Sequence, residues 1–461
     1  MLKDILYPYS LNFPAGEHTE LRAQTNKSRK VVLLSGNLTA NTRREVSGIS
    51  ARVYKNGIYG FSSIAELSDD AAASVLNAAV ENADFLDGHV HAGKPNIPTI
   101  ERGSYKVEND ISDIEQKAYI DYVKAVDDYI QRKYPKLTGR TIVATADSME
   151  KLLYTSDGFN AHSIMPRSYV YVFLNAESNS GVPLELFGVV GGGDTFDKNF
   201  TDFNAVHTKI DELYENLMQK REGVYAEAGL KTCILGGSLS GMLAHEAVGH
   251  TVEADLVMSG SVAAHCLNKR VASDLVSLTD FANTAFGKKC DIPVYVDDEG
   301  TPAQDAKIIE NGILTGYMNN RSSALHYGIK PQGNARAYEF SDEPLIRMRN
   351  TAIHPGTSKL EDMIASVDDG YYLVQTGNGQ ADTTGEFMFG VTMGYEIKNG
   401  KLGKAILDTT ISGVAFKALQ TVDMVSDTVT WSSSGFCGKK QLMPVSMGGP
   451  AMRIKLMIGG R

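Results

Sequence analysis

Three of the four Asn-Gly dipeptides constrain the fold of this chain more than any other feature. Asn56-Gly57, Asn311-Gly312 and Asn399-Gly400 each lie between strand-like runs of residues. This dipeptide favours the two-residue type I′ turn, because both of its residues readily adopt positive φ, and that turn joins two antiparallel strands. We therefore expect β-hairpins, and hence antiparallel sheet, in both halves of the sequence.

Helical patterns accompany these hairpins. Apolar residues recur at helical spacing over 205–219, and another helix should begin at Ser112, form a capping box with Glu115 and end before Pro135. A short strand at Lys231–Leu235 is followed by a glycine-rich turn and then by mostly strand-like sequence. Helices segregated from antiparallel hairpins are typical of the α+β class.

The chain is too long for one ordinary core. Its 461 residues favour two domains. We place the boundary within Gly223–Leu230. This division gives an N-terminal domain of mixed sheet and helix (1–225) and a β-rich C-terminal domain (226–461) that carries the helix of the candidate metal site.

Composition excludes several classes of partner. The net charge is −10 without a basic stripe, which argues against nucleic acid. No run approaches the roughly 18 apolar residues of a membrane span, and the opening MLKDILYPYSLNFPAGE lacks the apolar core of a signal peptide. The four cysteines are far apart and form no CxxC pair, which favours reduced thiols. We expect a cytoplasmic protein.

The segment GGSLSGMLAHEAVGHTVEAD (236–255) carries the candidate chemistry. In zinc peptidases with the pattern HExxH, two histidines four residues apart share one helix face. Here His245 and His250 are five apart, and five steps of about 100° separate their directions by about 140°. Gly249 can correct this by ending the helix in the left-handed conformation or by lying in a π-type turn. We expect His250 at or beyond the helix end, with Gly249 in a non-α conformation.

The motif alone leaves two interpretations open. Two histidines near a helix terminus can simply be satisfied structural residues. A metal held by His245 and His250 would also lack a further ligand, because Glu246 cannot easily be both ligand and catalytic base.

Longer segments resemble the TldD branch of the TldD/PmbA family. The HEAVGH segment matches its HExxxH signature, and the similarity looks continuous from about Leu235 to the end of the chain. It is weaker before that point. The matching segments are REVSGISARVYKNGIYGFSS (44–63), VDDEGTPAQDAKIIENGILTGYM (296–318), PQGNARAY (331–338), GNGQADTTGEFMF (377–389) and GFCGKKQLMPVSMGGP (435–450).

This resemblance implies a metallopeptidase that hydrolyses extended peptides or unfolded segments. Glu246 would act as general acid/base on a metal-activated water, and His245, His250 and Cys437 would hold a divalent metal, zinc or alternatively iron. The family also implies a dimer, either of two identical chains or with a PmbA/TldE-like subunit. The substrate would add along a sheet edge as an extended strand.

Several other polar residues have a plain structural interpretation that we favour. Glu253 and Asp255 would be solvated acids rather than acceptors for a ligand imidazole, and the acidic turn 297–299 would be solvated rather than a cation site. Cys233 lies in an apolar strand, so we expect a buried thiol. Cys290 follows two lysines that could lower its pKa, but a surface thiol is the simpler expectation.

Two other function classes compete with peptide hydrolysis. One is a non-hydrolytic peptide-binding or regulatory subunit with a structural metal; a structural zinc site would use four protein ligands and need no spare glutamate. The other is a metal–thiolate oxidoreductase, because cysteine also binds iron. Glu246 beside His245 favours hydrolysis over both.

Overall fold

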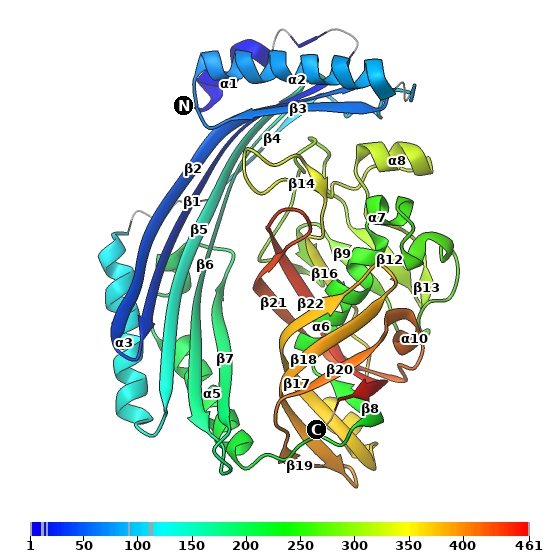
Figure 1. The fold of residues 1–461 in the computed structure, drawn as a ribbon. Coiled ribbons are helices and arrows are strands. Elements are labelled where there is room, and N and C mark those ends of the chain that lie inside the picture. Colours follow the sequence, from blue (N-terminus) through cyan, green and yellow to red (C-terminus); the bar gives the residue numbers. More distant parts are fainter. Residues whose placement is uncertain (1, 11–12, 15–16, 91–92, 110–113, 460–461) are drawn as a thin grey trace.

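The computed structural model describes residues 2–10, 13–14, 17–90, 93–109 and 114–459. Figure 1 shows a long curved sheet, built from the first part of the chain, standing beside a β-rich second part. The α+β class expected from the sequence is confirmed, with segregated helices beside largely antiparallel sheets. None of the described helices is both long and apolar enough to cross a membrane.

The first sheet has seven strands in the order β3-β2-β1-β5-β6-β4, with β7 also paired to β6. All pairs are antiparallel except β4–β6. The expected hairpin at Asn56-Gly57 is confirmed, because both residues have positive φ and join β2 to β3. The strands are β1 (His18–Leu34), β2 (Asn37–Lys55), β3 (Ile58–Ile64), β4 (Gly103–Glu108), β5 (Gly139–Thr155), β6 (Phe159–Glu177) and β7 (Pro183–Gly192).

Helices pack on this sheet in two separate groups (Figure 1). One core lies between the sheet and α2, and the other lies between the sheet, α3 and α5. The helix expected over 205–219 is confirmed as α5, whereas α3 begins at Gln116 with Glu115 as its N-cap residue. The proposed start at Ser112 lies outside the described residues. The helices are α1 (Leu2–Ser10), α2 (Asp69–Val90), α3 (Gln116–Lys133), α4 (Phe196–Asn199) and α5 (Asn204–Arg221).

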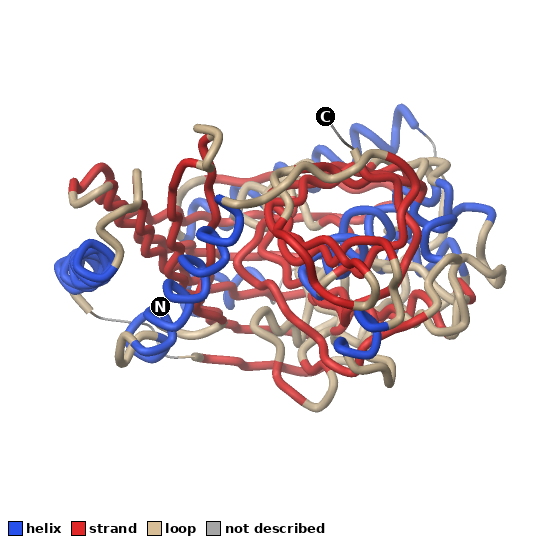
Figure 2. Tube along the Cα trace, turned by 90° about the horizontal axis from the view of Figure 1, so that it is seen from below, coloured by secondary structure: helices blue, strands red, loops and turns tan. Residues whose placement is uncertain are grey.

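The second part contains an eleven-stranded sheet, part of which closes into a ring. Strand β22 pairs with both β20 and β8, so that β8, β17, β18, β20 and β22 form a closed path. In Figure 2 these strands curl round instead of lying flat. The strands are β8 (Gly229–Leu235), β9 (Leu278–Phe281), β12 (Ala306–Glu310), β13 (Ile313–Leu314), β16 (Asn350–Ile353), β17 (Asp369–Ala381), β18 (Glu386–Lys398), β19 (Lys401–Ala405), β20 (Thr409–Val414), β21 (Met424–Cys437) and β22 (Met443–Ile458).

Short elements complete this part. The hairpins expected at Asn311-Gly312 and Asn399-Gly400 are confirmed, because these pairs have positive φ and join β12 to β13 and β18 to β19. Two further hairpin-like pairs are β10 (Thr284–Ala285) with β11 (Lys288–Lys289), and β14 (Ala335–Arg336) with β15 (Leu345–Ile346). The helices are α6 (Gly237–Met242), α7 (Ala254–Met258), α8 (Arg321–Tyr327), α9 (Leu360–Ala365) and α10 (Ala415–Leu419).

Glycines let the motif helix approach its sheet closely. A Cβ atom added at Gly237 would lie 2.5 Å from the carbonyl oxygen of Gly449, and one added at Gly241 would lie 3.1 Å from the nitrogen of Gly448. Helix α6 therefore packs backbone to backbone against β22. This close packing fixes the start of the segment that carries His245 and His250.

A buried ionic network joins the two parts of the molecule. Arg52 donates to Glu299 at 2.6 Å, and Lys151 donates to Asp298 at 2.7 Å. The expectation of a solvated turn at 297–299 is therefore wrong, because all three acids are buried. The cations that pair with Asp298 and Glu299 come from strands of the first sheet that are far away in the sequence, whereas Asp297 accepts hydrogen bonds from backbone N–H groups. Buried charges persist only when they are paired in this way.

Candidate metal centre

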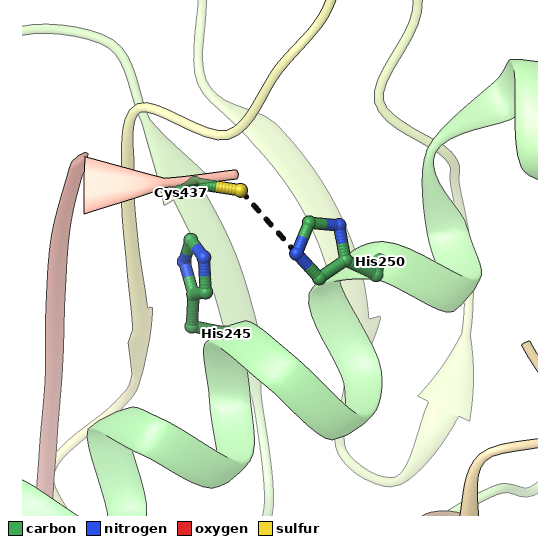
Figure 3. A group of neighbouring side chains, drawn as sticks. All are labelled: His245, His250 and Cys437. Atoms are coloured by element: carbon green, nitrogen blue, oxygen red, sulfur yellow. Dashed lines mark hydrogen bonds between the residues drawn. The ribbon is translucent and has the colours of Figure 1, made fainter. Parts of the chain in front are cut away.

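Three side chains from two distant segments of the sequence converge at one point (Figure 3). His245 lies in a π-helical turn, η1 (Leu243–Gly249), His250 begins a 3-10 turn, η2 (His250–Val252), and Cys437 ends β21. One donor atom from each side chain lies within 4.8 Å of the other two. Cys437 Sγ lies 3.3 Å from His250 Nε2.

The π-helical turn brings the two histidines to one side. The backbone N–H of His250 donates to the carbonyl of His245, a hydrogen bond that spans five residues instead of four. Of the two corrections considered for Gly249, the π-type turn is confirmed and the left-handed helix end is wrong. Gly249 has φ −52° and ψ −51°, so the expectation of a non-α conformation is also wrong. His250 lies just beyond the end of η1, as expected.

Gly249 is required for space, since its φ and ψ suit any residue. A Cβ atom added there would lie 2.2 Å from the Sδ atom of Met348 and 3.1 Å from the carbonyl oxygen of Ala244. Met348 is completely buried in the main core of the second part. The turn therefore fits against a side chain that the local sequence does not reveal.

We expect Gly249→Ala to destabilise the protein by about 1–3 kcal/mol, the usual cost of overpacking a core. The matched control is Gly88→Ala in α2, where an added Cβ would meet nothing within 4 Å; removing a helical glycine there should stabilise by about 0.5–1 kcal/mol. Denaturant unfolding of both variants measures the difference. Equal stability of Gly249→Ala and the parent would show that the Met348 side chain can move aside without lowering the free energy of unfolding.

The candidate metal centre shifts the pKa values of two of its side chains, Cys437 and His250. Burial would raise the pKa of the Cys437 thiol, but hydrogen bonds with His245 and His250 lower it to about 3. Burial would lower the pKa of His250, but its hydrogen bonds with Cys437 and Glu253 raise it to about 10. In the metal-free protein the pair is therefore a thiolate beside an imidazolium. A thiolate is the form of cysteine that binds metals.

Two residues hold this centre together: Glu253, which we expected to be a solvated acid, and Lys439, which the sequence did not single out. Glu253 is completely buried and accepts a hydrogen bond from His250 Nδ1 at 2.8 Å, so the expectation of a solvated acid is wrong for it. Lys439 lies 3.3 Å from Glu253 and 2.8 Å from Asp255, which makes Asp255 a paired acid as well. Lys439 follows Cys437 closely, so it connects the strand of the thiolate to the carboxylate that orients His250.

Glu246 lies beside the donor atoms of His245, His250 and Cys437 but is not part of that cluster. Its carboxylate oxygens are 4.0 Å from His245 Nε2 and 3.7 Å from His250 Nε2, and its side chain is 27% exposed. The carboxylate therefore faces the accessible side of the centre. A group in this position can exchange a proton with water or substrate.

The remaining cysteines lie elsewhere. Cys233 is buried as expected, and burial raises the pKa of its thiol to about 12. Cys266 donates a hydrogen bond to the carbonyl of Val262. Cys290 is partly buried rather than on the surface, and burial raises the pKa of its thiol to about 12, so the neighbouring lysines do not activate it.

The donor set fits a divalent metal. Two imidazoles and one thiolate are ligands typical of catalytic zinc sites, which keep three protein ligands and one open position. The interpretation of two satisfied structural histidines fits less well. His245 Nδ1 is buried and has no hydrogen-bond partner within the described part of the chain. The structure thus brings His245, His250 and Cys437 together around Glu246.

Comparison with known proteins covers most of the chain. Three family models match the chain in succession: PmbA/TldA metallopeptidase domain 1 over residues 19–83, the central domain over 109–220 and the C-terminal domain over 229–460. Together they cover both sheets and the candidate centre.

Curated relatives match over nearly the full length. A protein of Saccharolobus solfataricus named zinc metalloprotease TldD homolog is 28% identical over 90% of each chain. A metalloprotease TldD homolog of Buchnera aphidicola subsp. Acyrthosiphon pisum is 32% identical over 90% of this chain and 86% of that protein. The crystal structure of TldE from Thermococcus kodakarensis has the same fold, with a TM-score of 0.77 at 17% identity over 100% of this chain and 99% of that one.

Proposed function

Because the chain belongs to the TldD/PmbA family of metallopeptidases, we propose that it hydrolyses peptide bonds at a metal held by His245, His250 and Cys437. The single observation that carries this proposal is the convergence of the three donors within 4.8 Å beside Glu246. We propose zinc as the ion, in keeping with the name of the Saccharolobus solfataricus relative, with iron as the alternative.

A divalent metal at this position would supply Lewis acidity, which polarises a carbonyl group and makes water a better nucleophile. Glu246 accepts the proton of the attacking water on its carboxylate and returns that proton to the leaving amine. Glu253 holds His250 through Nδ1 and so presents Nε2 towards Cys437. Lys439 compensates the buried charge of Glu253.

We propose an extended peptide or unfolded segment as the substrate. Strand β17 pairs with β8 only as far as Leu373, and beyond that residue no described strand covers this edge. The edge lies next to Gly236, whose N–H donates to the carbonyl of Leu373 just before α6 begins. An extended chain could add here as a strand through its backbone alone. Peptides N-methylated at alternate amides should then lose binding, whereas side-chain changes should matter less.

The assembly and setting are further proposals. The fold shared with Thermococcus kodakarensis TldE supports pairing with a second copy or with a TldE-like subunit. Light scattering of the chain alone and with a TldE-like protein would distinguish the two assemblies.

The four free cysteines support a reducing, cytoplasmic location. We propose residues 1–225 and 226–461 as the two domains.

A metal count combined with a cleavage assay tests the function. We expect about one divalent ion per chain, cleavage of an unstructured peptide, loss of cleavage after chelation and recovery on adding zinc. One ion per chain without cleavage would indicate a non-hydrolytic peptide-binding or regulatory subunit. Redox cycling of bound iron without cleavage would indicate an oxidoreductase.

Glu253→Gln should weaken metal binding about tenfold, because partners that orient a ligand imidazole typically contribute 10–100-fold to affinity. The amide preserves the size of the side chain and removes the charge that His250 and Lys439 contact. Competition with a chelator of known affinity measures the change. The control is Asp255→Asn. Asp255 pairs with Lys439, which in turn pairs with Glu253, so this substitution should weaken metal binding less. A larger effect of Asp255→Asn would contradict this assignment.

A further inference from the structure

A cavity separate from the candidate metal centre lies between the β10–β11 hairpin and the first half of β21. Its volume is about 390 Å³, within the range of about 300–1,000 Å³ typical of small-ligand sites. The residues that matter for its chemistry are Phe286, Lys288, Lys289, Cys290, Asp427 and Trp431.

One strand separates this cavity from the motif helix. The ring of Trp431 packs directly on Gly448 of β22, where an added Cβ would lie 2.7 Å from the indole. Gly448 in turn contacts Gly241 in α6. The cavity and the metal centre therefore lie on opposite sides of β22, and a molecule bound in one does not touch the other.

The aromatic wall of the cavity begins at the turn of the β10–β11 hairpin. Phe286 and Gly287 form this two-residue turn, which requires the positive φ that both residues have. The ring of Phe286 contacts Phe281, His354 and Trp431, at centroid separations of 4.9, 5.3 and 6.3 Å. The turn thus places an aromatic ring beside Trp431 at the cavity.

The acidic side chains of the cavity already have partners, whereas two of its lysines form no ion pair with the described residues. Asp427 pairs with Lys359, and Asp291 accepts a hydrogen bond from Ser433 at 2.6 Å. Lys288 and Lys289 line the same cavity, are exposed, and have no ion pair within the residues that the structure describes. The cavity thus offers two cations beside an aromatic surface, while its two acids are already engaged.

We propose that this cavity binds an aromatic group that carries a single carboxylate. The rings of Phe286 and Trp431 would contact the aromatic group, and the lysines would pair with the carboxylate. When Lys359, the partner of Asp427, is counted with the two lysines that line the cavity, three lysines exceed the two acids by one formal charge, so a single negative charge fits better than a phosphate dianion. Aromatic acids have this chemistry, as does the C-terminal residue of a peptide that ends in phenylalanine.

Trp431 is the only tryptophan of the chain, so its fluorescence reports on this cavity. N-acetylphenylalanine should change the emission saturably, and N-acetylphenylalaninamide should bind about tenfold more weakly because it lacks the carboxylate. Lys288→Met/Lys289→Met should remove this preference without changing the melting temperature. A pentapeptide ending in phenylalanine distinguishes the two sources: equal or tighter binding indicates a peptide terminus, and exclusion indicates a free acid.

Three results would overturn the proposal: no saturable change, equal binding of acid and amide, or tighter binding of adenosine monophosphate than of the acid. A second measurement locates the ligand. N-acetylphenylalanine should slow alkylation of Cys290, which lines the cavity, but not of Cys266, which is also partly buried. Equal rates with and without ligand at Cys290 would place the ligand elsewhere. Neither measurement depends on bound metal or on peptide cleavage, so the result is independent of the proposed hydrolysis.

Discussion

Replacing Glu246 by glutamine should reduce peptide cleavage by about 10²–10⁴-fold, the usual contribution of a general acid/base. Metal content and unfolding stability should stay at parental values. The amide has the size of the carboxylate but cannot accept the proton of the attacking water. Glu246 lies 3.7 Å from His250 Nε2 and is not among the three converging donors, so its loss should spare the metal.

This experiment requires metal content and turnover to be measured on the same preparation. Glu361→Gln serves as the control, because Glu361 is an exposed glutamate in the first turn of α9. Parental turnover in metal-loaded Glu246→Gln would remove Glu246 from the mechanism. Loss of metal together with activity would make Glu246 a ligand and leave the acid/base role without a residue.

The sequence predicted those parts of the fold that depend on local chemistry. Asn-Gly turns need two residues with positive φ, and three of the four Asn-Gly pairs lie in hairpins, whereas Asn378-Gly379 lies within β17. The helical spacing of 205–219 predicted α5 because one face of that helix is buried. The closure of β8, β17, β18, β20 and β22 into a ring was not predicted, because it depends on pairing between strands far apart in the chain.

The spacing of the two histidines predicted an irregular helix and left its form open. A π-type turn and a left-handed helix end both bring His250 towards His245. In the π-type turn that forms, Gly249 has negative φ, and a glycine is needed there because Met348 leaves no space for a side chain. A contact between residues so far apart cannot be read from the motif.

Charged residues were the least predictable part. Local polarity favoured solvated acids at Glu253 and at 297–299, and both expectations failed because the partners come from elsewhere. Lys439 reaches Glu253 from two residues beyond the end of β21, and Arg52 reaches Glu299 from the first sheet. The position of Glu253 three residues after His250 was the one available signal, since residues at this spacing are neighbours on a helix.

The family resemblance implied that Cys437 is the third metal ligand, and the surroundings of its thiol in the structure suit that role. It is 3.3 Å from His250 Nε2, and the hydrogen bonds from both histidines lower the pKa of its thiol to about 3 despite burial. Arg347 donates to the carbonyl of Cys437 at 2.8 Å and so fixes the backbone of the strand end. Because the thiolate is already formed at neutral pH, metal binding would release a proton from the His250 imidazolium and none from Cys437.

Cys437→Ser should therefore weaken metal binding by more than about 100-fold, because even the loss of an orienting partner costs 10–100-fold. Cobalt(II) in the parental site should give a near-ultraviolet sulfur-to-metal charge-transfer band. Cys437→Ser should abolish the band, whereas Cys233→Ser, Cys266→Ser and Cys290→Ser should retain it, because those thiols lie outside the converging donors. A band that survives in Cys437→Ser and disappears in another variant would identify a different third ligand. Absence of a band from cobalt-loaded parental protein would show that no thiolate holds the metal, and the His₂Cys set would have to be abandoned.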